Sequence, residues 1–245
     1  MFTGFLNMIS VSRFKYRFTP TRLMSLLTFI VVILFVYLGY WQVSRFYEKT
    51  EMLKTYASRS QELARPLIEF KNLPKQYDHI KLVGHYLPIV FFLDNQHVQH
   101  QLGFDVISPL EIDAHHVVLV DRGFVPLNKT RAHLPRIKTP VDSAQLAGVA
   151  YYPSEKTWVL GPSYEIKDKH SVIIEKIDTE WVSHFLHKSV YPFIIRMNAN
   201  EPFGYQREWV TVSMPPARHM GYAVQWFAMA FVVFFLFIIL NVKKR

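Results

Sequence analysis

The chain has 245 residues, half of them hydrophobic, and a formal net charge of +9. It contains no cysteine, which excludes disulfides, thiolate catalysis and thiol-bound zinc or copper. Two long uncharged stretches account for the hydrophobic content, so the composition fits neither an ordinary basic soluble protein nor a carrier with many spanning helices.

The first uncharged stretch runs from Leu23 to Trp41. It is long enough for the roughly 20 residues that a helix needs to cross a bilayer. A cleaved signal peptide would have a shorter core and a small-residue cleavage site, whereas this stretch ends with aromatic residues that suit a membrane interface. The sequence therefore predicts a spanning helix over residues 23–41, preceded by a basic segment, residues 1–22, that contains Arg13, Lys15, Arg17 and Arg22 and no acidic residue.

Beyond Trp41, apolar residues recur at intervals of three and four as far as Leu67. This period is typical of an amphipathic helix. We expect it to continue the first spanning helix outward and to stop before Pro66, because the residue that precedes a proline disfavours helix.

From Tyr77 onward, alternating or short apolar runs predict strands. The predicted strands are Tyr77–Leu87, Val90–Asp94, Phe104–Ile112, His116–Arg122, Ala144–Tyr151, Val172–Ile177 and Phe193–Met197. Asp178 is placed to cap a short helix that contains Trp181 and Phe185. This pattern predicts one mostly antiparallel β domain, in the form of a barrel or a sandwich.

The second uncharged stretch runs from Met220 to Val242, with Gln225 and Asn241 as its strongly polar members. Lys243, Lys244 and Arg245 follow it, and all 19 acidic residues lie between the two stretches. Positive charge next to spanning helices marks the cytoplasmic or matrix side. The predicted organisation is a cytoplasmic N-terminus (1–22), a first span (23–41), an extracytoplasmic domain (42–219), a second span (220–242) and a cytoplasmic tail (243–245). Because the charge belongs to the ends, we expect no nucleic-acid partner.

Motifs inside the domain predict structure rather than chemistry. The pairs His97 with His100 and His115 with His116 match no zinc signature, and we expect them on the surface or in turns. Asp121-Arg122-Gly123-Phe124-Val125-Pro126 ends a predicted strand and indicates a structural turn, in which a neighbouring carboxylate is a candidate partner for Arg122; a partner or ligand surface is the alternative. No nucleophile elbow, P-loop or dinucleotide fingerprint is present.

The two membrane junctions carry the candidate site. On the second span, His219, Tyr222, Gln225 and Trp226 are spaced so that we expect one helix face, next to Arg218; on the first, Trp41 and Arg45 close the outer end. An aromatic belt with a snorkelling arginine would explain most of these residues, but it leaves Gln225 unexplained. The alternative is a haem or another flat apolar ligand, with His219 as axial ligand to the iron and Arg45 or Arg218 paired with propionates.

The chain resembles the surfeit locus protein 1 family in the order of six short motifs with a span at each end. They are Gly39-x-Trp41-Gln42-x-x-Arg45, Phe92-Leu93-Asp94-Asn95-Gln96, Val120-Asp121-Arg122-Gly123-Phe124-Val125-Pro126, Arg196-Met197, Tyr205-x-x-Glu208-Trp209 and Arg218-His219-x-Gly221-Tyr222-Ala223-x-Gln225-Trp226-Phe227-x-Met229-Ala230. The resemblance covers the chain from about Gly39 onward.

The resemblance implies an assembly factor, not an enzyme, that helps to mature subunit I of haem–copper cytochrome c oxidase. It implies haem a as a transient cofactor, with His219 as the iron ligand, and subunit I as the partner, with haem a synthase as a further candidate. The expected location is a bacterial inner membrane with a periplasmic domain, or the mitochondrial inner membrane in a eukaryote. A scaffold without a cofactor stays open as the alternative, whereas a sensor or an exported hydrolase finds no support in the sequence.

Overall fold

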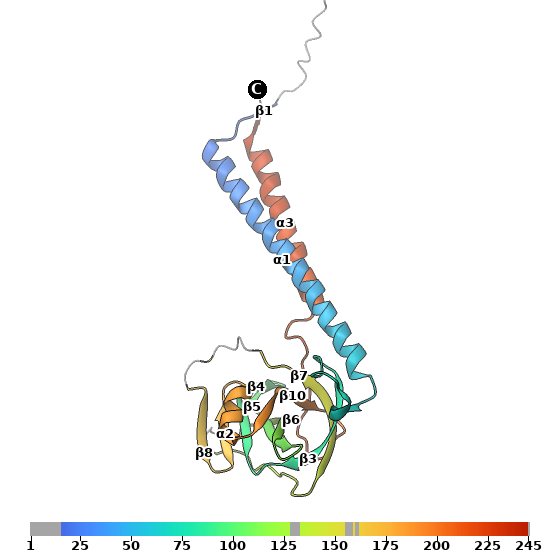
Figure 1. Cartoon of the computed structure of the whole chain (residues 1–245). Coiled ribbons are helices and arrows are strands. Elements are labelled where there is room, and N and C mark those ends of the chain that lie inside the picture. Colours follow the sequence, from blue (N-terminus) through green and yellow to red (C-terminus); the bar gives the residue numbers. More distant parts are fainter. Residues whose placement is uncertain (1–15, 128–132, 155–158, 160–161, 245) are drawn as a thin grey trace, which may run out of the picture. The chain divides into compact units, whose positions relative to one another are not determined.

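The computed structural model describes residues 16–127, 133–154, 159 and 162–244. The chain divides into two units, and Figure 1 shows the elements of each. The first unit comprises the described residues up to Met52 together with those from Val212 onward, and the second comprises Leu53–Thr211. Among the basic residues expected at the ends of the chain, Arg13, Lys15 and Arg245 lie outside the described residues.

Two helices, α1 (Arg22–Ser60) and α3 (Pro216–Asn241), make up most of the first unit. By length and composition, both are suited to crossing a membrane. The predicted continuation of the first helix beyond Trp41 is confirmed, because α1 runs without a break to Ser60. A short antiparallel pair, β1 (Tyr16–Phe18) with β11 (Val242–Lys244), joins the two ends of the described chain and was not predicted.

The second unit is built on one sheet in the strand order β2-β3-β7-β10-β6-β5-β4-β9-β8. Since β3 also pairs with β5, the stretch β3-β7-β10-β6-β5 closes on itself as a barrel. Most pairings are antiparallel, as predicted, but β2–β3, β4–β9 and β10–β6 are parallel. The strands are β2 (Arg65–Pro66), β3 (His79–Tyr86), β4 (Val90–Val98), β5 (Gln101–Glu111), β6 (His116–Pro126), β7 (Ala144–Tyr151), β8 (Tyr164–Asp168), β9 (Ser171–Ile174) and β10 (Ser189–Met197), with a 3₁₀ turn, η1, at Leu67–Glu69.

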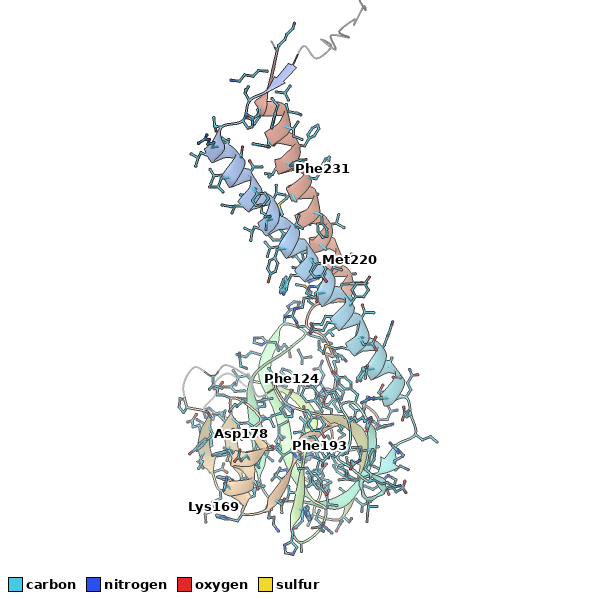
Figure 2. All side chains as sticks on the ribbon, turned by 45° about the horizontal axis from the view of Figure 1, so that its top comes forward. Phe124, Lys169, Asp178, Phe193, Met220 and Phe231 are labelled. Carbon is cyan, nitrogen blue, oxygen red and sulfur yellow. The ribbon has the colours of Figure 1, made fainter. Side chains whose placement is uncertain are left out.

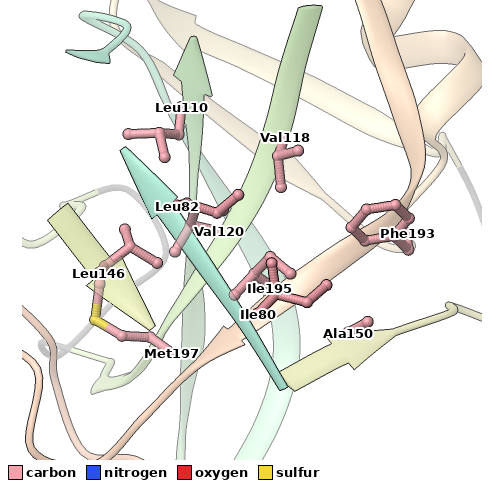
Figure 3. Packing of buried hydrophobic residues seen from close by; sticks show 10 residues of the cluster. All are labelled: Ile80, Leu82, Leu110, Val118, Val120, Leu146, Ala150, Phe193, Ile195 and Met197. Atoms are coloured by element: carbon pink, nitrogen blue, oxygen red, sulfur yellow. The ribbon is translucent and has the colours of Figure 1, made fainter. Parts of the chain in front are cut away.

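Alternation along the strands sorts the apolar side chains into separate cores. One core fills the closed part of the sheet, where Figure 3 shows side chains from β3, β5, β6, β7 and β10 meeting. A second core lies on the other face of the same strands. There Ile107, Leu119 and Ile194 pack with Val182 of α2 (Thr179–Leu186). Both faces of β6 and β10 are therefore covered, which explains why nine consecutive residues of β6 and three of β10 are buried.

The predicted cap of α2 is present: the Asp178 carboxylate accepts a hydrogen bond of 3.0 Å from the Trp181 backbone N–H. That bond is the main cause that holds the pKa of Asp178 below its usual value. The helix is short, so its stability depends on this end and on the packing of Trp181 and Phe185 against Phe91.

Removing the cap with Asp178→Ala is expected to lower the free energy of unfolding by about 1 kcal/mol, because an N-terminal N–H of α2 loses its acceptor. Denaturant unfolding of the detergent-solubilised chain measures the change. Asp142→Ala is the matched control, since that aspartate is exposed and caps no helix. Equal losses in the two variants would contradict the role of the cap.

Candidate functional site

The candidate site lies where α1 and α3 contact each other in the first unit. The α3 residues in the contact are spaced four, three and four apart, which is the period of a two-helix seam. A Cβ placed on Gly39 of α1 would lie 2.7 Å from the Phe227 ring, so the glycine permits the close approach. The α3 residues are His219, Ala223 and Ala230, which are buried, and the half-buried Trp226, whose ring centroid lies 5.5 Å from that of Phe35.

His219 is the polar member of this seam, and it is only 8% exposed. Its Nδ1 lies 2.7 Å from Oε1 of Gln42 on α1. Because an amide oxygen only accepts, Nδ1 carries the proton and donates it to Gln42. Nε2 is then the unprotonated nitrogen, and it is buried without a hydrogen-bond partner in the part of the chain that the structure describes.

This arrangement has the chemistry of an imidazole prepared for a metal. A ligating histidine usually donates its second ring N–H to a protein oxygen, which fixes the tautomer and the orientation of the ring. A buried acceptor without a donor destabilises the fold, so we expect Nε2 to bind a group other than the residues that the structure describes. The chemistry of the His219–Gln42 pair is therefore compatible with the predicted role of His219 in holding a haem iron, and that role stays a prediction.

Trp41 and Arg45 lie one turn apart on α1. The Arg45 guanidinium lies 5.6 Å from the centroid of the Trp41 ring and forms an ion pair of 2.5 Å with Glu48. Trp41 is 43% exposed. Arg45 thus has a carboxylate partner within its own helix, and it would have to exchange that partner to hold a propionate.

The remaining predicted residues do not meet at one place. Trp226 lies in the seam with His219, whereas Arg218, Tyr222 and Gln225 are exposed on α3. Gln225 lies six positions after His219, which is a rotation of about 240° on an α-helix. The two side chains therefore lie on different sides of α3. The site assignments of Arg218, Tyr222 and Gln225 stay predictions.

Gln42 is the functional candidate that the site prediction missed. The residue belongs to the first motif, but its part in the site depends on a contact with a residue 177 positions away. The signal that could have found it is the recurrence of Gly39 and Gln42 at seam spacing, opposite a buried histidine.

A polar cluster in the second unit was also missed. It joins Asp105 of β5, Asp121 of β6 and Arg196 of β10, with Asp121 and Arg196 in register on neighbouring strands. The Arg196 guanidinium lies 3.6 Å from the Tyr151 ring centroid and 5.3 Å from that of Trp209. Burial raises the pKa of Asp105 to about 6 and, together with the charge of Asp105, raises the pKa of Asp121 well above its usual value.

The turn predicted at Asp121-Arg122-Gly123 was wrong, because β6 continues to Pro126. Arg122 is fully buried, and the predicted carboxylate partner is replaced by neutral oxygens. Its guanidinium donates to the Phe203 carbonyl at 2.6 and 3.0 Å, to the Lys138 carbonyl at 2.6 Å, and to the hydroxyls of Ser108 and Thr139 at 3.2 and 3.3 Å. The residue therefore has a structural function, which agrees with the general expectation for this motif.

The histidine pairs lie as expected. His115 and His116 follow Asp113, whose carboxylate accepts from both backbone N–H groups at 2.9 Å. His97 and His100 lie at the exposed end of the β4–β5 hairpin. Among the described residues, no group of three or more His, Asp or Glu side chains could hold a metal ion.

Comparison with known proteins gives a consistent result. Residues 29–231 match the model of the SURF1 family. A SURF1-like protein of Rickettsia bellii is 32% identical over 155 residues, a match that spans 60% of each chain. SURF1-like proteins of Rickettsia conorii and Rickettsia felis are 24% and 25% identical, over 88% and 89% of this chain and 90% and 96% of theirs.

Proposed function

This chain belongs to the SURF1 family, and we propose on that basis that it is a membrane-bound assembly factor for haem–copper cytochrome c oxidase. α1 and α3 would anchor it in a bacterial inner membrane, with both termini in the cytoplasm and the β domain in the periplasm. The length and composition of the two helices support the anchor, and the basic residues at both ends support the orientation.

Within that function, the chain would hold haem a as cargo for subunit I of the oxidase, with haem a synthase as a candidate supplier. The observation that carries this step is the buried, unpartnered Nε2 of His219. His219 would bind the iron, Gln42 would orient the imidazole, and Trp226 would offer an apolar surface beside it. The bound group would supply a Lewis-acidic iron for Nε2 to coordinate, and we propose no reaction on it.

Gln42 would act as a positioning residue. A hydrogen bond from Nδ1–H to an acceptor raises the basicity of Nε2 and fixes the plane of the ring. Gln42→Leu removes the acceptor, whereas Gln42→Glu keeps an oxygen at the same place and strengthens it. The two variants therefore separate orientation of the imidazole from packing of the seam.

The test uses the full chain purified in detergent. The host cells make haem a and lack their own gene for a protein of this family. We expect His219→Ala to lower the haem a content per protein at least about 10-fold and Gln42→Leu to lower it about 10-fold, with recovery in Gln42→Glu. A shifted visible absorption band in Gln42→Leu would report the change at the iron. His115→Ala is the matched control, because that histidine is exposed in a turn.

Equal haem content in wild type and His219→Ala would overturn the ligand assignment. Restoration of full oxidase activity by His219→Ala in the deletion strain would favour the alternative, a cofactor-free scaffold that stabilises a subunit I intermediate. Thermal unfolding of each variant distinguishes loss of ligand from loss of fold.

A further inference from the structure

One face of α3 contacts none of the residues that the structure describes outside this helix. The residues on it are spaced three, four, three and four apart, so they lie above one another along the helix. They are offset by about 200° from the seam that holds His219 against α1. We call this surface the Gln225 face, and its members are Arg218, Gly221, Gln225, Ala228 and Val232, all of them exposed.

The Gln225 face has room for a close neighbour. A Cβ placed on Gly221 would meet no atom within 4 Å. Ala228, two turns further along, is also small, and Val232 is 51% exposed. Small residues at this spacing let a second helix approach closely inside a membrane. The available space does not identify the molecule that binds this face, but the polar residues on the face limit which kind of molecule can bind there.

Gln225 supplies the chemical argument. The apolar stretch 220–240 has its midpoint at Ala230, and Gln225 is five residues away, which is about 7.5 Å along the axis. That distance is well within the half-thickness of about 15 Å of the hydrocarbon core. Within the described residues, the Gln225 amide makes no hydrogen bond. An amide held in hydrocarbon without a partner is unfavourable, and lipid chains offer none.

Arg218 adds a charge at the outer end of the same face. It lies two turns before Gln225, about 10 Å along the axis, where the helix would emerge from the bilayer. No ion pair of Arg218 occurs among the described residues, and its side chain is exposed. The face therefore presents a cation at the membrane surface and an amide inside the hydrocarbon, on one line.

We propose that the Gln225 face docks against a membrane-spanning helix of another protein. That helix would offer a hydrogen-bonding side chain at the depth of Gln225 and an acidic side chain at the depth of Arg218. The partner must be helical or barrel-like, because unpaired backbone does not occur in hydrocarbon, and a helix is what matches a single face. A second copy of this chain fits poorly, since its Arg218 would lie at the same depth as the first and repel it.

This inference rests on the proposed function only in that α3 crosses the membrane. It goes beyond that function by assigning Arg218 and Gln225 to a protein partner in place of the ligand role that the sequence predicts. Binding of haem by His219 is separate, because His219 faces α1 from the opposite side of α3. The two proposals can therefore fail independently.

The photo-reactive group must be part of the residue itself, because a thiol in hydrocarbon stays protonated and reacts poorly with maleimides. A benzophenone amino acid would replace Ala228 or Val232, on the face, and Phe231 or Phe234, exposed on other sides of α3, and each variant would be irradiated in native membranes. We expect cross-links to one membrane-spanning protein from Ala228 and Val232 and much weaker cross-links from Phe231 and Phe234.

The polar residues give the decisive comparison. Gln225→Leu, combined with the benzophenone residue on the face, is expected to lower the cross-linking yield about 3- to 30-fold, and Gln225→Asn to retain more of it. Arg218→Glu should also lower the yield. His219→Ala should leave it unchanged, which separates this interface from the haem site.

Three results would overturn the proposal. Equal cross-linking from the face and the control positions, or a yield that does not respond to Gln225→Leu, would show that the face contacts only lipid. A cross-linked product that is a dimer of this chain would show that the occupant is a second copy and not another protein.

Discussion

Arg122→Leu is expected to lower the free energy of unfolding by about 3–5 kcal/mol, the largest effect of a single substitution in the β domain. The change removes a fully buried guanidinium and leaves the Phe203 and Lys138 carbonyls, which now accept hydrogen bonds from it, without donors. The hydrogen bonds to these carbonyls are only partly buried, so the expected loss comes mainly from the guanidinium itself, which is fully buried and cannot be replaced by water at the same place. Chemical denaturation of the detergent-solubilised chain measures the loss.

Arg122→Lys is expected to recover little of that stability. The arginine donates from three nitrogens in a fixed plane, and it lies between the rings of Tyr86 and Tyr205, with 5.2 and 5.4 Å to their centroids. A lysine ammonium has no planar fork and stacks poorly on two rings. The charge of a lysine is also confined to one nitrogen, whereas the charge of the guanidinium is spread over three. Burial already lowers the pKa of Arg122, so the site disfavours a localised charge even more strongly.

Arg207→Leu is the matched control for this prediction. Arg207 also donates to backbone carbonyls, those of Asn198, Ala199, Glu201 and Tyr205, but it is partly exposed. Water can replace its hydrogen bonds, so its loss should cost about 1–2 kcal/mol. A cost for Arg122→Leu no greater than that for Arg207→Leu would contradict the argument from burial.

A pH dependence centred on Asp105 is the second large effect that we expect. Burial raises the pKa of this carboxyl from 3.8 to about 6, opposed by the charge of Arg196. In the folded state the carboxyl therefore keeps its proton at pH values where the unfolded chain has released it. The contribution of this carboxyl to the free energy of unfolding is complete below about pH 4 and is lost as the pH rises through about 6.

The measurement is the difference in unfolding free energy between wild type and Asp105→Asn at several pH values. We expect this difference to change by up to about 1.4 kcal/mol for each pH unit between about pH 4 and pH 6 and to level off on both sides. Asp113 and Asp178, whose pKa values are lowered, act below that window and cancel in the difference, whereas Asp121 is coupled to Asp105, so the difference reports the titration of the pair. A difference that does not vary with pH would contradict the assignment.

Much of the fold follows from the sequence because its strands alternate cleanly or run apolar over both faces. β3 and β7 were predicted within two residues at each end for this reason, whereas β6 and β10 were each predicted four residues too short at one end. β8 was missed because all five of its residues are exposed, so no periodic burial marks it. β8 is a strand because it pairs with β9, and the hydrophobic pattern of a single segment does not reveal which strand it pairs with.

The β4–β5 hairpin shows a second limit. Polar residues from Asp94 onward ended the predicted strand, yet β4 continues to Val98 across an irregularity at Asn95, whose φ is 59°. The turn itself uses Gln99 and His100 at φ 48° and 65° in place of the usual Asn-Gly pair. The sequence therefore lacked the ordinary turn signal at this point.

At the candidate site, the sequence identified His219 but not its surroundings. A polar residue at the start of an apolar span is visible in any sequence. Which helix face it occupies, and that Gln42 meets it, depends on how two distant helices pack. The expectation that Gln225 shares a face with His219 was wrong, because six positions along an α-helix amount to a rotation of about 240°.

The position of β10 has a consequence for the order in which the β domain can form. This strand lies between β6 and β7 and contributes Phe193, Ile195 and Met197 to the core of the barrel (Figures 2 and 3 label Phe193). Until residue 197 has been synthesised, both β6 and β7 have an open edge. The closing contacts join residues far apart in the chain, a topology that folds slowly. A growing chain therefore needs protection of those edges until nearly the whole domain is available.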